Sequence, residues 1–179
     1  MIRGSTYLRR FIAEATGAEI AEAAAVLPIM FLILLGIFWF GQAFSIYGAI
    51  TRAAQDGARA GAAPSCTTCA PLTASARAAN ATAAIQSALT IAKLDPTIAR
   101  QPSPAPTFIS CGGPMTCDGG NSNFCVQAPV QLSNTTTGSG VCGVSVSFQY
   151  PFQFRLPFTS LNNQRIWLAA SARVRLENQ

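Results

Sequence analysis

The hydrophobic positions divide the chain into one long apolar run near the N-terminus and, much later, three stretches in which every second residue is apolar. The run contains no charged residue between Ala23 and Ile50, and it exceeds the roughly 20 residues that a helix needs to cross a hydrocarbon core. A backbone in lipid has to satisfy its own hydrogen bonds, so a single segment crosses as a helix. The run therefore predicts a membrane-spanning helix, with a buried core helix as the alternative.

The helical pattern continues beyond the span. Small residues recur at every fourth position from Ala49 to Gly61, including Ala53 and Gly57, and form a helix-packing stripe that another element can approach closely. Because these positions lie at or past the membrane interface, a sheet or a neighbouring subunit is the expected occupant. An unbroken helix over residues 19–63 would be about 67 Å long and would serve as anchor and spine. The alternative is a plain stalk before an unrelated domain.

After this helix the pattern becomes irregular and then helical again. Residues 64–71 form a proline-bounded break, and residues 72–94 predict a second, alanine-rich helix that Asp95 and Pro96 end. The apolar side of this helix consists of Ile85, Leu89 and Ala92. Because this side is thin, we expect partial burial against the sheet. Residues 99–123 show no period and predict a long loop.

Alternation with a period of two predicts three strands, which would pack one face of a small antiparallel sheet on the helices. The link between the first two strands is turn-rich and fits a hairpin loop. Pro151 and Pro157 lie in an irregular crossing after the second strand, where they exclude central pairing. The predicted fold class is α+β. The inward residues are Phe124, Val126, Ala128, Val130 and Leu132; Val144, Val146, Phe148 and Tyr150; and Ile166, Leu168, Ala170, Ala172, Val174 and Leu176.

Composition and charge support an anchored protein with one ordinary domain. Half of the 179 residues are hydrophobic and only 11% are charged, as is typical of a bitopic membrane protein. Arg3, Arg9 and Arg10 precede the span and predict a cytoplasmic N-terminus. The net charge of +5 is modest and spread along the chain, whereas nucleic-acid binding needs a clustered basic patch. No nucleic-acid partner is predicted.

All six cysteines follow the span. An even number on the exported side predicts disulfides in an oxidising periplasm and loops that are stapled by them. The sequence does not choose among the connectivities, although local spacing favours three short links. These are Cys66 with Cys69, Cys111 with Cys117, and Cys125 with Cys142.

Catalytic and metal chemistry finds little support. The chain has no histidine, and the carboxylates beyond the span and its extension, Asp95, Asp118 and Glu177, are not paired in the sequence. The motif at residues 66–69 lacks the βαβ context of a redox site, and the other cysteine spacings do not fit zinc. The prediction is therefore a protein that is not an enzyme, with no catalytic residue, cofactor, metal or small-molecule substrate. A membrane-anchored periplasmic thiol oxidoreductase is an alternative.

The residues just before the span carry the most specific chemistry. A cut after Gly17 would make Ala18 the first residue and Glu22 the fifth, behind a basic leader, which is the layout of a type IV prepilin. A carboxylate at depth in a membrane costs about 2.5 to 3.5 kcal/mol, so Glu22 needs a partner. The new amine of Ala18 lies on the same helical face, and a neighbouring subunit's amine is another choice. The alternative is a solvated Glu22 and no cut.

The stretch from Gly17 to Ala63 resembles the N-terminal domain of the TadE family. The shared features follow in order: a glutamate, a Leu-Pro pair, a Leu/Ile-rich span, a Phe-Gly pair and an Ala-rich patch ending in Gly-Ala-Arg. Flp-type processing sites usually place an aromatic residue after the glutamate, where this chain has Ala23. The residues that match are Glu22, Leu27, Pro28, Phe40, Gly41, Gly57, Ala58 and Arg59.

This resemblance implies a non-catalytic pseudopilin-like or minor pilin subunit of a tight-adherence (Tad, Flp-type) pilus assembly or secretion apparatus. Its expected partners are the membrane, other pilins or pseudopilins, Tad inner-membrane assembly proteins and a prepilin peptidase. The expected organisation is a leader over residues 1–17, a TadE-like helix over 18–63 and a periplasmic domain over 64–179, held in the bacterial inner membrane by a single pass. A bitopic surface or adhesin-like protein outside any pilus is the alternative.

Overall fold

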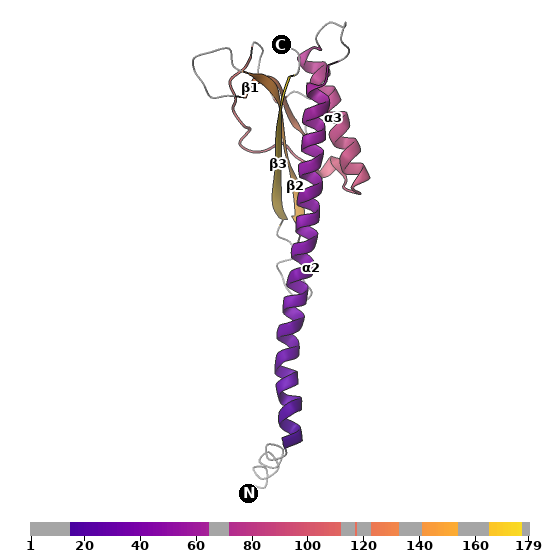
Figure 1. The fold of residues 1–179 in the computed structure, drawn as a ribbon, viewed down its shortest axis with the longest axis vertical. Coiled ribbons are helices and arrows are strands. Elements are labelled where there is room, and N and C mark those ends of the chain that lie inside the picture. Colours follow the sequence, from indigo (N-terminus) through magenta and orange to yellow (C-terminus); the bar gives the residue numbers. More distant parts are fainter. Residues whose placement is uncertain are drawn as a thin grey trace. The chain divides into compact units, whose positions relative to one another are not determined.

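The computed structural model describes residues 15–64, 72–111, 117, 123–132, 141–153 and 165–176, with side chains from residue 20 onward. Their element order confirms the predicted α+β class (Figure 1). The chain divides into two compact units, Met1–Ala43 and Phe44–Gln179, each of which is described by itself. The elements are α2 (Ala15–Ala62), α3 (Ala74–Ile91), the 3₁₀ turn η1 (Pro96–Ile98), β1 (Cys125–Gln131), β2 (Cys142–Gln153) and β3 (Arg165–Arg175).

Helix α2 contains 48 residues and supplies the described part of the first unit. It continues through Pro28. Because the nitrogen of proline carries no hydrogen, the carbonyl of Ala24, one turn earlier, lacks its usual helical hydrogen bond. In the interior of the helix the other backbone groups bond within the segment, which is what an apolar solvent requires. The long unbroken helix predicted from the apolar run is thus present.

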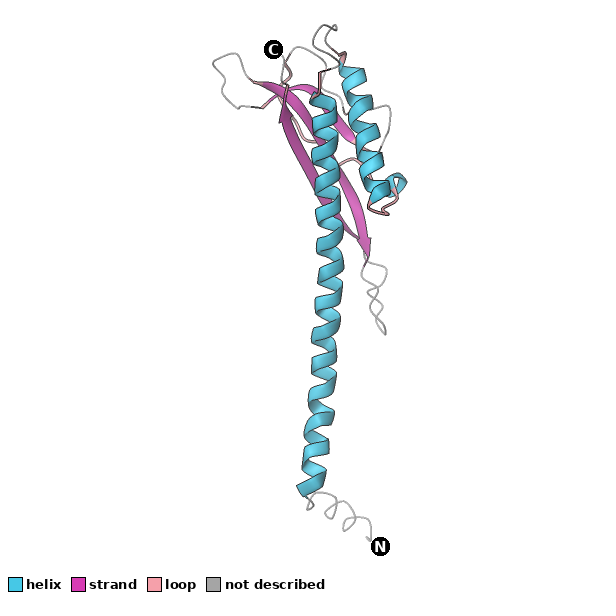
Figure 2. Cartoon of the chain, turned by 45° about the vertical axis from the view of Figure 1, so that its right-hand side comes forward, coloured by secondary structure: helices cyan, strands magenta, loops and turns pink. Residues whose placement is uncertain are grey.

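In the second unit, the strands form an antiparallel sheet in the order β1-β2-β3. Residues 44–62 of α2 and helix α3 lie side by side against one face of this sheet (Figures 1 and 2). The predicted alternation is confirmed for most of the residues assigned to the inward face, and the fully buried ones in the core are Phe124, Val126, Val144, Val146 and Phe148. It is wrong for Ile166, which is 45% exposed. It is also wrong for Val130, because the register of β1 shifts after Gln127 and pairs Val130 with Gly143, on the opposite face from Val144.

Strand β2 is longer than the sequence pattern indicates. It passes through Pro151, which pairs with Trp167 of β3, and ends at Gln153. The prediction that Pro151 lies in an irregular crossing is therefore wrong, although among the described residues Pro151 has a strand partner on the β3 side alone. Gln149 exchanges its backbone hydrogen bonds with Arg100 on the side away from β3, at 2.9 and 2.8 Å. Because backbone groups alternate along a strand, the nitrogen of Pro151 also points away from β3, and no bond to β3 is lost. Pro157 lies outside the described residues.

The other face of the sheet is covered by part of the predicted loop. Isolated bridges join Arg100 to Gln149 and Ser110 to Val130. Between them, the side chain of Gln127 donates from Nε2 to the carbonyl of Pro106 at 3.1 Å. The polar side chains on this face, Gln127, Ser145 and Ser147, are buried as a result. A segment without periodicity thus closes the second side of the sheet.

Helix α3 ends earlier than predicted. Thr73 caps its start by accepting a hydrogen bond from the amide of Ala76 at 3.3 Å. At its end, Lys93 takes a left-handed conformation with φ of 58°. The amides of Lys93 and Leu94 then bond back to the carbonyls of Thr90 and Leu89 at 3.0 and 2.9 Å, which is a Schellman motif. The helix therefore stops at Ile91, and Ala92, predicted on its apolar side, is an exposed cap residue.

The closest approach between the two helices occurs at the small residues of α2. A Cβ on Gly57 would overlap Ile85 Cγ1 and lie 2.9 Å from its Cδ1, and a Cβ on Gly61 would lie 3.2 Å from the Cβ of Ala81. Ile85 and Ala81 are fully buried. Since these partners have no free space, the absence of a side chain at Gly57 sets the distance between the helices.

We predict that Gly57→Ala destabilises the head by about 1 to 3 kcal/mol, because the added methyl group overlaps a buried isoleucine. Gly48→Ala is the matched control, since a Cβ there meets nothing within 4 Å and alanine favours a helix by up to about 1 kcal/mol. Urea unfolding of the detergent-solubilised chain measures both. Equal stabilities for the two variants would contradict the packing argument.

Candidate functional site

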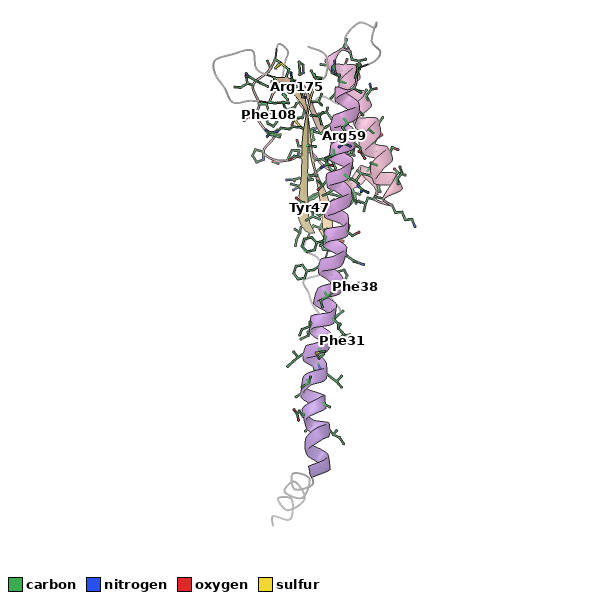
Figure 3. The ribbon with its side chains drawn as sticks, viewed as in Figure 1. Phe31, Phe38, Tyr47, Arg59, Phe108 and Arg175 are labelled. Atoms are coloured by element: carbon green, nitrogen blue, oxygen red, sulfur yellow. A yellow bond between two sulfur atoms is a disulfide. The ribbon has the colours of Figure 1, made fainter. Side chains whose placement is uncertain are left out.

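The described part of the first unit is an apolar helix whose side chains are mostly exposed. Among the described helices, only Ile20–Ala62 within α2 is long and apolar enough to cross a membrane, and its most hydrophobic window is unburied. Figure 3 shows Phe31 and Phe38 standing out from the helix. Such a surface is stable in lipid or against other apolar helices. The exposed residues include Ile20, Leu27, Ile29, Met30, Phe31, Leu32, Ile33, Leu34, Ile37, Phe38 and Phe40.

The residues of the candidate processing site lie at the start of this helix. Gly17 and Ala18 are within the first turns of α2, which begins at Ala15, and Glu22 is exposed. Ala18 and Glu22 are four residues apart in a continuous helix, so they share a face. No described residue forms an ion pair with Glu22. The carboxylate is therefore open to an amine from its own chain or from a neighbouring chain.

The small-residue stripe lies in the second unit, where its own chain covers it. Ala53 is fully buried, and Gly57 and Gly61 face α3. A Cβ on Gly61 would also lie 3.2 Å from Val144 Cγ1 in β2. The sequence pattern predicts a sheet or a neighbouring subunit here and does not indicate α3, because α3 carries only a thin apolar side. The residues past the span thus act as a structural element of the head.

Arg77 joins the end of α2 to the start of α3, a role that the sequence pattern does not predict. Its guanidinium donates from Nη1 to the carbonyl of Gly61 at 3.2 Å and from Nε to the carbonyl of Leu72 at 3.3 Å. Gly61 lies in the last turn of α2, where carbonyls lack helical partners and attract a cation. The available signal was that Arg77 is the only charged residue in α3.

The cysteine links of the head differ from the prediction. The structure pairs Cys111 with Cys142 and Cys117 with Cys125. In the antiparallel pair, Cys125 lies opposite Ser147, whereas Cys142 lies opposite Gln131. Cys125 and Cys142 are therefore at opposite ends of the ladder, about 20 Å apart along the strands, beyond disulfide reach.

Backbone contacts of the covering loop explain the partner of Cys142. The amide of Cys111 donates to the carbonyl of Pro129 at 3.2 Å, and the amide of Gln131 donates to the carbonyl of Ile109 at 2.8 Å. These bonds place Cys111 beside the end of β1 that Cys142 faces. The predicted link of Cys66 with Cys69 lies outside the described residues.

Two arginines on the outer face of the sheet stack on aromatic rings. The guanidinium of Arg100 lies 3.4 Å from the ring centroid of Trp167 and donates from Nε to Gln149 Oε1 at 3.0 Å. The guanidinium of Arg173 lies 4.4 Å from the ring centroid of Phe108. Planar guanidinium groups favour such stacking. These contacts hold residues 100–108 against the strands and serve the fold.

The carboxylates weighed as general bases do not form a catalytic group in the described residues. Asp95 caps η1, where its Oδ1 accepts from the hydroxyl and the amide of Thr97 at 2.7 and 2.9 Å. These hydrogen bonds lower the pKa of Asp95. No cluster of three His, Cys, Asp or Glu side chains that could hold a metal occurs among the residues that the structure describes. Asp118 and Glu177 lie outside them.

The geometry defines a class of protein: a head of α+β fold whose core includes the end of a helix that fits a single membrane pass. The family model described as TadE-like protein matches residues 17–59, which confirms the resemblance over that stretch. The match includes the exposed apolar part of α2 and most of its buried part. No curated protein and no solved structure is significantly similar to the chain. A TadE-like segment suggests a pilin-like protein associated with a Tad pilus.

Tyr150 generates a prediction about pH. Its buried hydroxyl accepts a hydrogen bond from the amide of Asp95 at 3.1 Å, and burial raises the pKa of Tyr150 above its ordinary 10.0. A raised pKa means that the folded state favours the neutral phenol. Its contribution is complete below the unfolded pKa near 10.0 and is lost as the pH rises through the folded value.

We predict that Tyr150→Phe lowers the stability of the head by about 0.5 to 1.5 kcal/mol at neutral pH, because the amide of Asp95 loses its acceptor. The difference between the wild type and Tyr150→Phe shrinks above about pH 10, since only the wild type loses the neutral phenol. Urea titrations of both proteins from neutral to alkaline pH measure this difference. A difference that stays constant over the whole range would contradict the role of the buried hydroxyl.

Proposed function

We propose that this chain is a non-catalytic, pseudopilin-like subunit of a Tad-type pilus assembly or secretion apparatus in the bacterial inner membrane. The observation that carries the proposal is that one continuous helix, α2, is both an exposed apolar segment and part of the head core. The TadE-like match extends over both parts of that helix. A subunit of this design is held in the membrane and presents its head outside it.

The proposed orientation places the N-terminus in the cytoplasm and the head in the periplasm. Two disulfides in the head support an oxidising compartment on that side. The basic residues Arg3, Arg9 and Arg10 support retention of the N-terminus in the cytoplasm. The proposed partners are other pilins or pseudopilins, Tad inner-membrane assembly proteins and a prepilin peptidase that cuts between Gly17 and Ala18.

The proposed cut predicts that the protein extracted from membranes begins at Ala18 and is lighter than the full chain by residues 1–17. Intact-mass spectrometry and N-terminal sequencing measure this directly. The same chain from cells without a prepilin peptidase is the control and should retain Met1. A chain that still begins at Met1 in cells with an active peptidase would contradict the processing step.

Glu22 is proposed as the assembly carboxylate, which pairs with the amine that the cut creates. We predict that Glu22→Ala leaves membrane insertion unchanged and lowers the number of pili at least about tenfold, because a charge-assisted bond at the membrane edge is lost. Gln42→Ala is the matched control, since Gln42 is an exposed polar residue of the same helix without a charge. Electron microscopy counts pili, and carbonate extraction monitors insertion. Normal piliation with Glu22→Ala would show that the carboxylate is only interfacial.

A further inference from the structure

Most of the exposed large apolar side chains of the head lie at one of its ends. Among the described residues of the second unit, two such side chains, Ile109 and Val141, lie within two residues of the linked Cys111 and Cys142. The others come from α2, α3, η1 and β3, and we call them the apolar rim. These residues are Phe44, Tyr47, Ile91, Ile98 and Ile166.

Contacts between the helices place Ile91 beside the first residues of α2 in this unit. Arg77, near the start of α3, bonds to the carbonyl of Gly61, near the end of α2. Helix α3 therefore runs antiparallel to residues 44–62 of α2. Its last residue, Ile91, lines the same groove as Ala49. Ile91 is 81% exposed and lies close to the level of Tyr47.

The sheet brings Ile166 to the same end. A Cβ on Gly61 would lie 3.2 Å from Val144, and Val144 pairs with Val174 of β3. Ile166 precedes Val174 by eight residues, which is about 26 Å along a strand. Phe44 precedes Gly61 by seventeen residues, which is also about 26 Å along a helix. Ile166 and Phe44 are therefore both at the end of the head opposite Gly61.

The turn η1 joins this end through β2. The amide of Asp95, which precedes η1, donates to the hydroxyl of Tyr150 at 3.1 Å. Arg100, which follows η1, exchanges backbone hydrogen bonds with Gln149. Both contacts are in the second half of β2, which pairs with the start of β3. Ile98, 46% exposed, thus belongs to the same end as Ile166.

Positive charge exceeds negative charge at this end. Lys93 follows α3, Arg165 begins β3, and both are exposed. Neither forms an ion pair or a side-chain hydrogen bond with the part of the chain that the structure describes. Arg100 is exposed and stacks on a ring, and the carboxylate of Asp95 is bonded to Thr97. Exposed apolar groups with surplus positive charge match an anionic membrane surface.

We propose that the apolar rim docks the head on the membrane surface, with Lys93 and Arg165 beside the phosphates of anionic lipids. Continuity with the anchor supports lipid as the occupant. Phe44 and Tyr47 are the last exposed large apolar residues of α2, whose exposed apolar surface begins at Ile20. Aromatic residues at such a position are typical of a membrane interface, so headgroups reach this end of the head.

The anchor makes this contact intramolecular. Helix α2 continues from Phe44 into the segment that the proposed function places in lipid, so the rim is never far from the headgroups. A tether of this kind raises the effective concentration of the surface, and a few isoleucines and cations are then sufficient for docking. The inference rests on the membrane-anchored part of the proposed function.

Photo-cross-linking from the full-length protein to lipid tests the docking. The purified chain is reconstituted in liposomes of phosphatidylcholine and phosphatidylglycerol. A benzophenone amino acid replaces Ala92, an exposed residue next to Ile91, and, in a control protein, Ile109 near Cys111. We expect lipid adducts, identified by mass spectrometry, from position 92 at least about tenfold above those from position 109.

Variants separate docking from mere proximity to the bilayer. Ile91→Ser/Ile98→Ser removes exposed apolar groups and should lower the adduct yield from position 92 about fivefold or more. Lys93→Glu/Arg165→Glu should lower it by a similar factor in liposomes with phosphatidylglycerol, and much less in phosphatidylcholine alone. Melting followed by circular dichroism reports whether each variant folds.

Arg175→Glu is the matched charge control, because Arg175 is an exposed cation at the other end of β3. Figure 3 labels Arg175 and Tyr47 at opposite ends of the head. The adduct yield of this variant from position 92 should equal that of the wild-type sequence.

Equal yields from positions 92 and 109, cross-links from position 92 to protein in place of lipid, or a yield that the serine or the glutamate variant leaves unchanged would each overturn the proposal. Carbonate extraction tests the anchor separately. A chain that carbonate releases would contradict the membrane-anchored subunit of the proposed function. An anchored chain without lipid adducts would contradict the docking alone.

Discussion

The close contact between α2 and α3 at Gly57 is the constraint on which the head depends. A glycine there lets Ile85 approach the backbone of α2, and the short distance brings both helices onto the same face of the sheet. Arg77 then bonds the last turn of α2 to the chain that enters α3. The sheet closes the core with residues such as Phe148, which contacts the ring of Phe124 edge-on. Without the short interhelical distance, these layers would not meet.

The elements with strong periodicity could be predicted from the sequence. The apolar run predicts the long helix, and period-two alternation predicts the strands and most of their inward residues, because a membrane or a core imposes the pattern residue by residue. The alternation does not reveal the register shift in β1 after Gln127, which puts Val130 on the other face. The loop over residues 100–111 shows no period. It covers the sheet through backbone bonds and through Arg100 and Arg173 on aromatic rings, contacts that depend on tertiary position.

The errors in the predicted details have similar causes. The end of α3 is set by the left-handed conformation of Lys93. A glycine at this position would have predicted such a helix end, whereas a lysine does not. The predicted disulfide pairs were based on short spacing in the chain. The antiparallel pairing of β1 with β2 instead places Cys125 at one end of the ladder and Cys142 at the other. At the candidate processing site, the sequence pattern does not reveal that Gly17 and Ala18 lie within a helix or that Glu22 is exposed.

The contribution of α2 to the core affects the biogenesis of the head. Ile50, Ala53, Ala54 and Ala58 belong to the buried core, although they precede the proline-bounded break that looks like a domain boundary. A head cut free at Pro64 would lack one wall of its own interior. In the function proposed above, folding of the head would have to wait for the helix that anchors it, and export, insertion and core formation would be successive stages of one process.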